Sequence, residues 1–157
     1  MLDDDKLTLQ MAELIFQLRQ KCAAKDSYFV KTLEISVAEY NCLVQFFETP
    51  NYSVKELAER LDITSGGVTR IITSLEERGY IQRTISSEDR RGIKVALTDK
   101  GCKIVSEIRE ASTQVHGNIL GQIKPEKRKQ VLEGIKRLNS ALDTWLLEHQ
   151  TGGSRKK

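Results

Sequence analysis

Residues 53–101 read SVKELAERLDITSGGVTRIITSLEERGYIQRTISSEDRRGIKVALTDKG and decide the fold of this chain. Apolar residues recur at intervals of three and four over 54–61 and over 65–79, a spacing typical of two amphipathic helices joined by a tight turn. Alternating polarity over 80–85 and 93–97 is typical of two β-strands. Helix, turn, helix and β-hairpin in this order predict a winged helix-turn-helix, a module that reads DNA.

Residue types at the ends of these elements support the prediction. Thr64 can cap the second helix, because its hydroxyl can accept a hydrogen bond from a free amide of the first turn. Gly79 can end that helix, since glycine enters the left-handed conformation without a Cβ clash. Upstream, Ser36 and Glu39 have the spacing of a capping box, which predicts the start of another helix. Residues 52–54 could add a short third strand to the wing sheet.

The N-terminal half of the second helix leaves short polar side chains, one guanidinium and two glycines uncovered. Such groups suit base edges and phosphates in a major groove, and glycine lets the backbone come close to a phosphate. DNA contacts are therefore expected at Ser65, Gly66, Gly67, Thr69, Arg70 and Thr73. The alternatives are a solvated helix face and, for the glycines, a weak start to the helix. At the far end, residues 76–78 are expected to be solvated, because acids repel phosphate.

Basic residues gather in the predicted hairpin. A two-stranded ribbon can hold an arginine over the adjacent minor groove, where negative potential is concentrated. The expected contacts are Arg83, Arg90, Arg91 and Lys94. Asp89 precedes Arg91 by two residues and could pair with it, which would set the direction of the guanidinium. The alternative is an ordinary charged loop.

This stretch resembles the MarR family of transcriptional regulators. The resemblance rests on LAERL at 57–61, VTRIITSLEERGYI at 68–81 and DRRGIKVALTDKG at 89–101, and it extends more weakly over 35–47. Family members often have glycine in the turn where this chain has Asp62, but aspartate also tolerates a left-handed conformation. The resemblance implies an obligate homodimer that binds a pseudo-palindromic DNA operator, usually as a repressor released by a small ligand or by oxidation.

Three further helices with heptad-like apolar stripes are predicted outside this module. A small winged helix cannot cover all three stripes, so we expect them to form an intertwined dimer stem. The predicted fold is mainly α with a small β wing: a helical dimerisation stem of residues 1–33 and 99–149, a winged helix-turn-helix lobe of residues 34–98, and a disordered tail of residues 150–157. The alternative is a monomeric helical bundle that caps the module.

Composition narrows the class of protein. The 157 residues are 39% hydrophobic and 30% charged with a net charge of +3, which suits one domain with a real core. No apolar run approaches the roughly 18 residues of a membrane span, and the acidic N-terminus is unlike a signal peptide, so we expect a cytoplasmic protein. No nucleophile-base pair, phosphate loop or metal-ligand spacing is present, so we expect neither an enzyme nor a cofactor.

The mode of control is open between several hypotheses. The resemblance implies a small-molecule effector between stem and lobe, and the candidate pocket residues are Tyr28, Tyr40 and His116; the alternative for each is a packed side chain. A redox response through a cysteine is the second hypothesis. Peroxide-sensing relatives carry a cysteine in the middle of the first helix, where this chain has none, and Cys22 continues an apolar stripe, where a buried thiol is inert. A winged-helix scaffold for protein interactions is the third, but such modules usually lack a basic wing tip.

Overall fold

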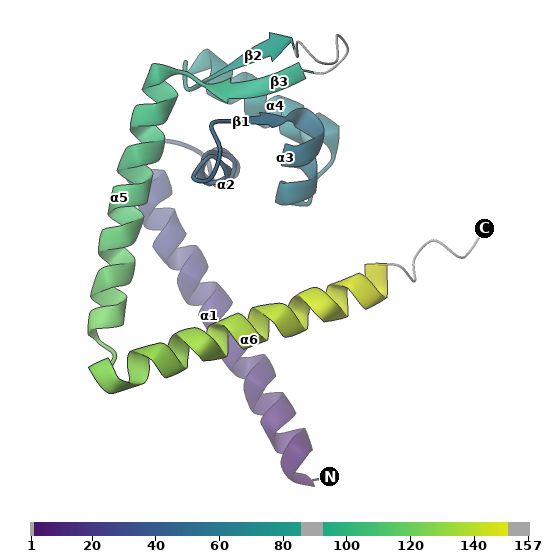
Figure 1. Cartoon of the computed structure of the whole chain (residues 1–157), viewed down its shortest axis with the longest axis vertical. Coiled ribbons are helices and arrows are strands. Elements are labelled where there is room, and N and C mark those ends of the chain that lie inside the picture. Colours follow the sequence, from purple (N-terminus) through teal and green to yellow (C-terminus); the bar gives the residue numbers. More distant parts are fainter. Residues whose placement is uncertain (1, 86–92, 151–157) are drawn as a thin grey trace, which may run out of the picture. The chain divides into compact units, whose positions relative to one another are not determined.

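The computed structural model describes residues 2–85 and 93–150. The chain divides into two compact units, residues 1–110 and 111–157, which are described separately. In chain order the elements are α1 (Leu2–Thr32), α2 (Val37–Gln45), β1 (Asn51–Ser53), α3 (Val54–Leu61), α4 (Ser65–Glu77), β2 (Ile81–Ile85), β3 (Ile93–Leu97), α5 (Asp99–Gly121) and α6 (Pro125–Gln150) (Figure 1). The predicted fold class, mainly α with a small β wing, is confirmed.

The first unit contains a three-stranded antiparallel sheet in the order β1-β3-β2. The central strand pairs Val95 with Tyr52 of β1 on one side and with Arg83 of β2 on the other. Val95, at the centre of the sheet, is fully buried. The third strand predicted at 52–54 is therefore confirmed, one residue earlier than expected.

Side-chain caps explain where the short helices begin. Ser36 accepts from the amide of Glu39 at 3.1 Å, while the Glu39 carboxylate accepts from the amide of Ser36 at 2.6 Å, which confirms the predicted capping box. Ser53 and Glu56 repeat this reciprocal pair at the start of α3. Thr64 accepts from an amide of the first turn of α4, as predicted. Each cap satisfies amides that the helix itself leaves without partners.

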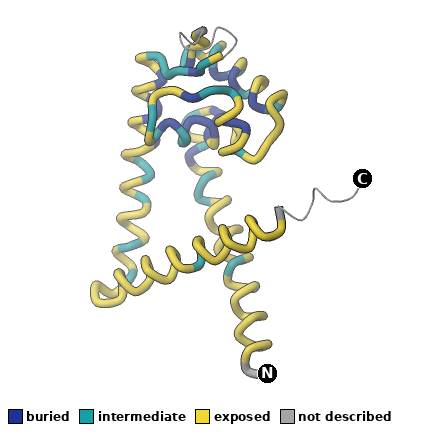
Figure 2. Tube along the Cα trace, turned by 45° about the vertical axis from the view of Figure 1, so that its right-hand side comes forward, coloured by how far each residue is buried: buried dark blue, intermediate teal, exposed yellow. Residues whose placement is uncertain are grey.

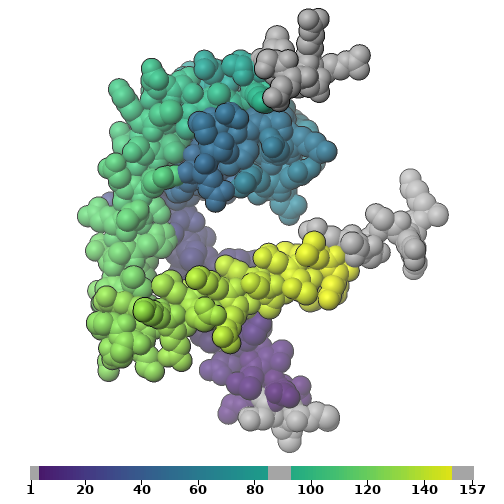
Figure 3. Space-filling view, in the orientation of Figure 1, coloured from purple at the N-terminus to yellow at the C-terminus, as the bar shows by residue number. Residues whose placement is uncertain are grey.

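The helices of the first unit pack around a small apolar core. The predicted stripes of α3 and α4 meet: Leu57, Val68 and Ile72 are fully buried. Ile63, which follows the left-handed turn at Asp62, is 40% exposed. Figure 2 shows the buried residues gathered in α2 to α4, the sheet and the first turns of α5. In Figure 3 the side chains of α2, α3 and the wing strands form a continuous surface on the face in view.

The end of α4 is joined closely to the start of α5. A Cβ placed on Gly101 would lie 1.8 Å from the carbonyl oxygen of Tyr80, so the two backbones approach at a distance that only glycine permits. The Thr98 hydroxyl donates to the carbonyl of Gly79 at 2.6 Å and accepts from the amide of Gly101 at 3.0 Å. Gly79 has φ of 73°, the left-handed conformation predicted for it.

Helix α1 also belongs to the first unit and is continuous over Leu2–Thr32. Within this helix the Ser27 hydroxyl donates to the carbonyl of Ala23 at 2.9 Å. Its large apolar side chains lie exposed; they include Leu7, Leu9, Met11, Leu14, Phe16 and Leu18. Only its C-terminal end contributes to the core, through Phe29.

The second unit holds the last turns of α5 and helix α6. Pro125 is the first residue of α6, and Arg128 Nε donates to the carbonyl of Ile123 at 3.0 Å. Along α6 the large apolar side chains are again exposed; they include Val131, Leu132, Ile135, Leu142, Trp145, Leu146 and Leu147. Over residues 2–85 and 93–150, no helix combines the length and apolar character needed to cross a bilayer.

Candidate nucleic-acid interface

Helix α4 presents two different faces. Val68, Ile72 and Leu75 are fully buried against the rest of the first unit. The residues predicted to contact DNA lie mainly on the opposite, exposed side, where the structure brings together Ser65, Gly66, Thr69, Arg70 and Thr73. Gly67 is half-buried, and its missing Cβ faces the side chains of Thr64 and Ile63. Apart from Gly67, the predicted set therefore forms one accessible surface.

The hydroxyls on this surface have defined directions. Thr69 Oγ1 donates to the carbonyl of Ser65 at 2.8 Å, and Thr73 Oγ1 donates to the carbonyl of Thr69 at 2.9 Å. Because each proton points back into the helix, each threonine oxygen keeps its capacity to accept a hydrogen bond. Thr73 Oγ1 already accepts from Arg83 Nη2 at 2.8 Å, whereas Thr69 Oγ1 can accept from a cytosine or adenine amino group.

Arg83 of β2 binds α4 directly. Its Nη1 lies 2.6 Å from Oε2 of Glu76, and its Nη2 donates to the hydroxyl of Thr73 at 2.8 Å. The expectation that Glu76 is merely solvated is wrong, because its carboxylate is held by this arginine. Sequence reasoning placed Arg83 on phosphate, and a DNA contact there stays a prediction. Within the chain, Arg83 ties the wing to α4.

The rest of the wing is described in part. Asp89, Arg90 and Arg91 lie outside the described residues. Lys94 is half-buried on β3, opposite Ser53 in one neighbouring strand. The pKa of Glu56 is held below its ordinary value, first by hydrogen bonds with Ser53 and then by the positive charge of Lys94 and of a second basic residue, Arg60.

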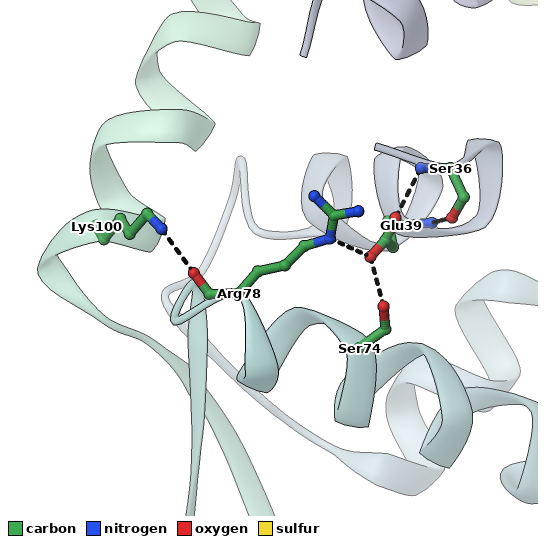
Figure 4. Close-up of polar contacts among 5 residues, drawn as sticks. All are labelled: Ser36, Glu39, Ser74, Arg78 and Lys100. Atoms are coloured by element: carbon green, nitrogen blue, oxygen red, sulfur yellow. Dashed lines mark hydrogen bonds and ion pairs between the residues drawn. The ribbon is translucent and has the colours of Figure 1, made fainter. Parts of the chain in front are cut away.

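A buried carboxylate connects α2 with the far end of α4 (Figure 4). Glu39 is 3% exposed, and besides the amide of Ser36 it accepts from Ser74 Oγ at 2.7 Å and from Arg78 Nε at 3.0 Å. Lys100 of α5 donates to the backbone carbonyl of Arg78 at 2.7 Å. Arg78 is exposed, as expected, but its guanidinium also pairs with Glu39, which was not expected. Sequence reasoning found the capping role of Glu39 and missed its contacts with α4.

Opposing effects set the ionisation of Glu39. Burial acts to raise the pKa of this carboxyl, but hydrogen bonds from Ser36 and Ser74 and the charge of Arg78 outweigh it and lower the pKa below its ordinary value. The carboxylate is thus charged at neutral pH, which makes its contacts with α4 charge-assisted.

The candidate effector residues are divided between the two compact units. Tyr40 is buried and its ring is stacked on Phe29 with centroids 5.9 Å apart, which fits the alternative of a packed side chain. Tyr28 contacts the same phenylalanine edge-on but is 65% exposed. His116 belongs to the other compact unit, where its Nδ1 lies 2.7 Å from the carbonyl oxygen of Ser112.

A cavity that sequence reasoning missed lies between the end of α2 and the first turns of α5. It has a volume of about 290 Å³ and is lined by Phe46, Phe47, Glu48, Thr49, Pro50, Leu97, Cys102, Val105, Ser106 and Arg109. The guanidinium of Arg109 lies 5.1 Å from the centre of the Phe47 ring and donates to the carbonyl of the same residue. No local pattern in the sequence marks these residues as a pocket.

The three cysteines have different surroundings. Cys42 is fully buried, and burial raises its pKa to about 12. Cys22 and Cys102 are exposed, so the interpretation of Cys22 as a buried thiol is wrong for the single chain. Within residues 2–85 and 93–150, no three His, Cys, Asp or Glu side chains are grouped so that they could hold a metal ion.

Known proteins resemble this chain in sequence and in fold. The profile of the MarR family matches residues 35–93. The organic hydroperoxide resistance transcriptional regulator of Bacillus subtilis (strain 168) is 30% identical over 144 residues, which cover 92% of each chain. A MarR protein from Peptoclostridium difficile superposes with a TM-score of 0.72 at 18% identity over 86% of this chain and 90% of that chain. Streptococcus pneumoniae FabT, crystallised in complex with DNA, superposes with a TM-score of 0.67 at 23% identity over 83% and 99%.

Proposed function

This chain belongs to the MarR family of DNA-binding transcriptional regulators, and we propose that it acts as a homodimeric repressor that a small molecule releases from a pseudo-palindromic operator. The observation that carries the proposal is the exposed side of α4. There Ser65, Thr69 and Arg70 stand on the face opposite the fully buried Val68 and Ile72, so the helix can enter a major groove without disturbing its packing.

In the proposed complex, the two recognition helices enter successive major grooves about 34 Å apart along the duplex. Arg70 supplies a charged contact in the groove, and the wings reach the flanking minor grooves through Arg90 and Arg91, with Asp89 orienting the latter. Lys94 and Arg83 complete the set at the base of the wing. Arg83 contacts phosphate through N–H groups that Glu76 and Thr73 do not engage.

The exposed apolar stripes support the dimer. Helices α1 and α6 each expose large apolar side chains along their length; Met11, for example, is 52% exposed and Trp145 is 54% exposed. Contiguous apolar surface of this kind marks an interface in soluble proteins. We therefore propose that residues 1–33 and 99–149 form the stem with a second copy and that residues 34–98 form the DNA-binding lobe. Sedimentation velocity of the wild type and of Ile135→Asp tests this, because a monomeric wild type would exclude it.

Binding to DNA is tested by selecting duplexes from a random library and titrating the selected operator by fluorescence anisotropy. Arg91→Ala is expected to lower affinity for all duplexes and to reduce the salt slope by about 1, whereas Thr69→Ala is expected to change the preferred site. Failure of the wild type to retain any duplex at low salt would contradict the proposal and favour a protein-interaction scaffold.

Release by a small molecule is the proposed control, with Tyr28, Tyr40 and His116 as the candidate contacts. Titration of the protein–operator complex with a panel of small aromatic carboxylates tests it, because a true effector lowers operator affinity. Binding that leaves operator affinity unchanged would exclude that compound as the effector.

A redox response is the second candidate, and one observation favours it. The Bacillus subtilis relative is named for organic hydroperoxide resistance, and this chain exposes the thiols of Cys22 and Cys102. Treatment with an organic hydroperoxide should then abolish operator binding by the wild type and spare Cys22→Ser. Equal loss, or no loss, in both proteins would exclude Cys22 as the sensor. We also propose a cytoplasmic location, because the operator of a bacterial regulator lies there.

A further inference from the structure

The Glu39 carboxylate joins two parts of the first unit that are far apart in sequence. Its Oε2 accepts from the amide of Ser36 at 2.6 Å, at the start of α2. Its Oε1 accepts from Ser74 Oγ at 2.7 Å and from Arg78 Nε at 3.0 Å, on α4 (Figure 4). One oxygen therefore serves the cap and the other serves the recognition helix. Among the described residues, Glu39 is the charged side chain that is buried.

Capping alone does not account for this arrangement. Glu56 makes the same reciprocal pair with Ser53, at 2.7 and 3.1 Å, and it does so while exposed. Burial of a carboxylate is costly unless charge and hydrogen bonds compensate it, and a buried ion pair is often no more stable than apolar packing. Buried polar groups can instead select one arrangement of the surrounding elements, because hydrogen bonds are directional and apolar contacts are not.

The residues that Glu39 holds on α4 share a stripe with Arg70. Positions four apart on a helix lie one above the other, so Arg70, Ser74 and Arg78 follow one line along α4. Ser74 and Arg78 are held by α2, and the backbone carbonyl of Arg78 is held by Lys100 of α5 at 2.7 Å. The rotation of α4 about its own axis is therefore set at two successive turns on the side that carries Arg70.

A small rotation of α4 matters for base contacts. With a helix radius of about 5.5 Å including side chains, a rotation of about 20° moves an outward-facing group by about 2 Å. A hydrogen bond tolerates only about 0.5 Å in its donor–acceptor distance. Phosphate contacts from flexible basic side chains tolerate more, and they carry no sequence information.

We propose that Glu39 is a positioning residue for DNA recognition. By holding Ser74 and Arg78, it fixes the rotation of α4 about its own axis and so directs the Arg70 guanidinium at a DNA base. This inference rests on the proposed function. In this role Glu39 affects the ratio of operator affinity to non-specific affinity, whereas a purely structural role would leave that ratio unchanged.

The test compares two capping glutamates that differ in their contact with α4. Glu39→Gln removes the charge with little change in shape, and Glu56→Gln is the matched control. For each protein, anisotropy titrations give the Kd for the operator selected by the wild type and the Kd for a scrambled duplex of equal length. Glu39→Gln is expected to lower the ratio of the two affinities about tenfold, the equivalent of one misaligned base contact, with the scrambled Kd unchanged. Glu56→Gln should keep the ratio within about twofold of the wild type.

Two further variants make the test decisive. Ser74→Ala removes an α4 partner of Glu39 and should lower the ratio of operator affinity to scrambled-duplex affinity about threefold. If Glu39→Gln does not fold, the result for Ser74→Ala alone tests the proposal. In an Arg70→Ala background, Glu39→Gln should have little further effect, because the contact it directs is already absent. An unchanged affinity ratio in Glu39→Gln or, failing that, in Ser74→Ala would overturn the proposal. A wild type that does not distinguish the operator from the scrambled duplex would overturn the proposed function itself.

Discussion

Arg83 and Glu76 form an ion pair between the wing and the recognition helix, with Nη1 2.6 Å from Oε2. The backbone amide of Arg83 also donates to Glu76 Oε1, at 3.3 Å, so the carboxylate contacts both the main chain and the side chain of β2. Because Arg83 Nη2 donates to the hydroxyl of Thr73, the same guanidinium contacts the exposed side of α4 that we propose as the DNA-binding face. The angle between wing and helix is thus set by a planar group with several fixed donors.

Arg83→Lys is expected to lower operator affinity about fivefold, although it keeps the positive charge. A lysine ammonium cannot reproduce the fork of donors that spans Glu76 and Thr73. The salt slope of binding should stay close to that of the wild type, since the number of charges is the same. Arg137→Lys is the matched control, because Arg137 pairs with Glu133 at 3.1 Å on α6. Equal operator affinity in the wild type and Arg83→Lys would contradict this role of the guanidinium.

Gly101→Ala is expected to destabilise the protein by about 3 kcal/mol, at the upper end of the cost of overpacking. Its Cβ would meet the carbonyl oxygen of Tyr80 at 1.8 Å, and backbone cannot move aside as a side chain does. Gly117→Ala, in the same helix with no atom within 4 Å of its Cβ position, should instead stabilise by about 0.5–1 kcal/mol. Urea unfolding of both variants measures the difference, and a Gly101→Ala protein as stable as the wild type would show that α4 and α5 can separate.

Stability should depend on pH through Glu39. Its folded pKa is below the ordinary value of 4.5, so near that pH the unfolded chain binds more protons than the folded one. Its contribution is therefore complete above pH 4.5 and is lost as the pH falls through the folded pKa. Urea unfolding across this range should show a steeper loss for the wild type than for Glu39→Gln. Parallel curves for the two proteins would mean that Glu39 has the same pKa in both states.

Cys42 should resist alkylation in the folded protein. With its pKa raised to about 12, the thiolate fraction at neutral pH is very small, and the side chain is fully buried. Mass spectrometry after brief treatment with N-ethylmaleimide should find label on Cys102, which is exposed, and label on Cys42 only after denaturation. In the variant Cys42→Ala the label that appears only after denaturation should be lost, which identifies Cys42 as the slowly labelled site. Rapid labelling of Cys42 would show that the core around α2 opens readily.

The helix-turn-helix was predictable because its signals are local. Thr64 and Gly79 mark the ends of α4 through caps that depend on a few neighbouring residues, and Asp62 occupies the left-handed turn with φ of 52°. The alternation of the wing strands likewise predicts their pairing, since one face must be buried. The predicted DNA face follows from the same periodicity, because the residues that do not pack on α3 must face outward.

Contacts between distant residues were not predictable from these signals. Glu39 and Ser74 are 35 positions apart, and nothing in the spacing of either says that they meet. The cavity beside Phe47 and Arg109 was not predictable either, because its lining comes from three separate segments of the chain. The exposure of Ile63 was not predictable either, because apolar character alone does not say on which side of a left-handed turn a side chain lies. The homodimer and the limits of its stem stay predictions.

The tie between Glu39 and α4 limits how DNA preference can be transplanted between relatives. A chimera that receives only residues 65–78 from another regulator, without serine at 74 and arginine at 78, would leave the glutamate enclosed without its counter-charge. Grafts of this kind should misfold or lose discrimination unless position 39 is exchanged together with the helix. If Glu39 positions α4 as proposed, operator preference depends on the segment around position 39 as well as on α4.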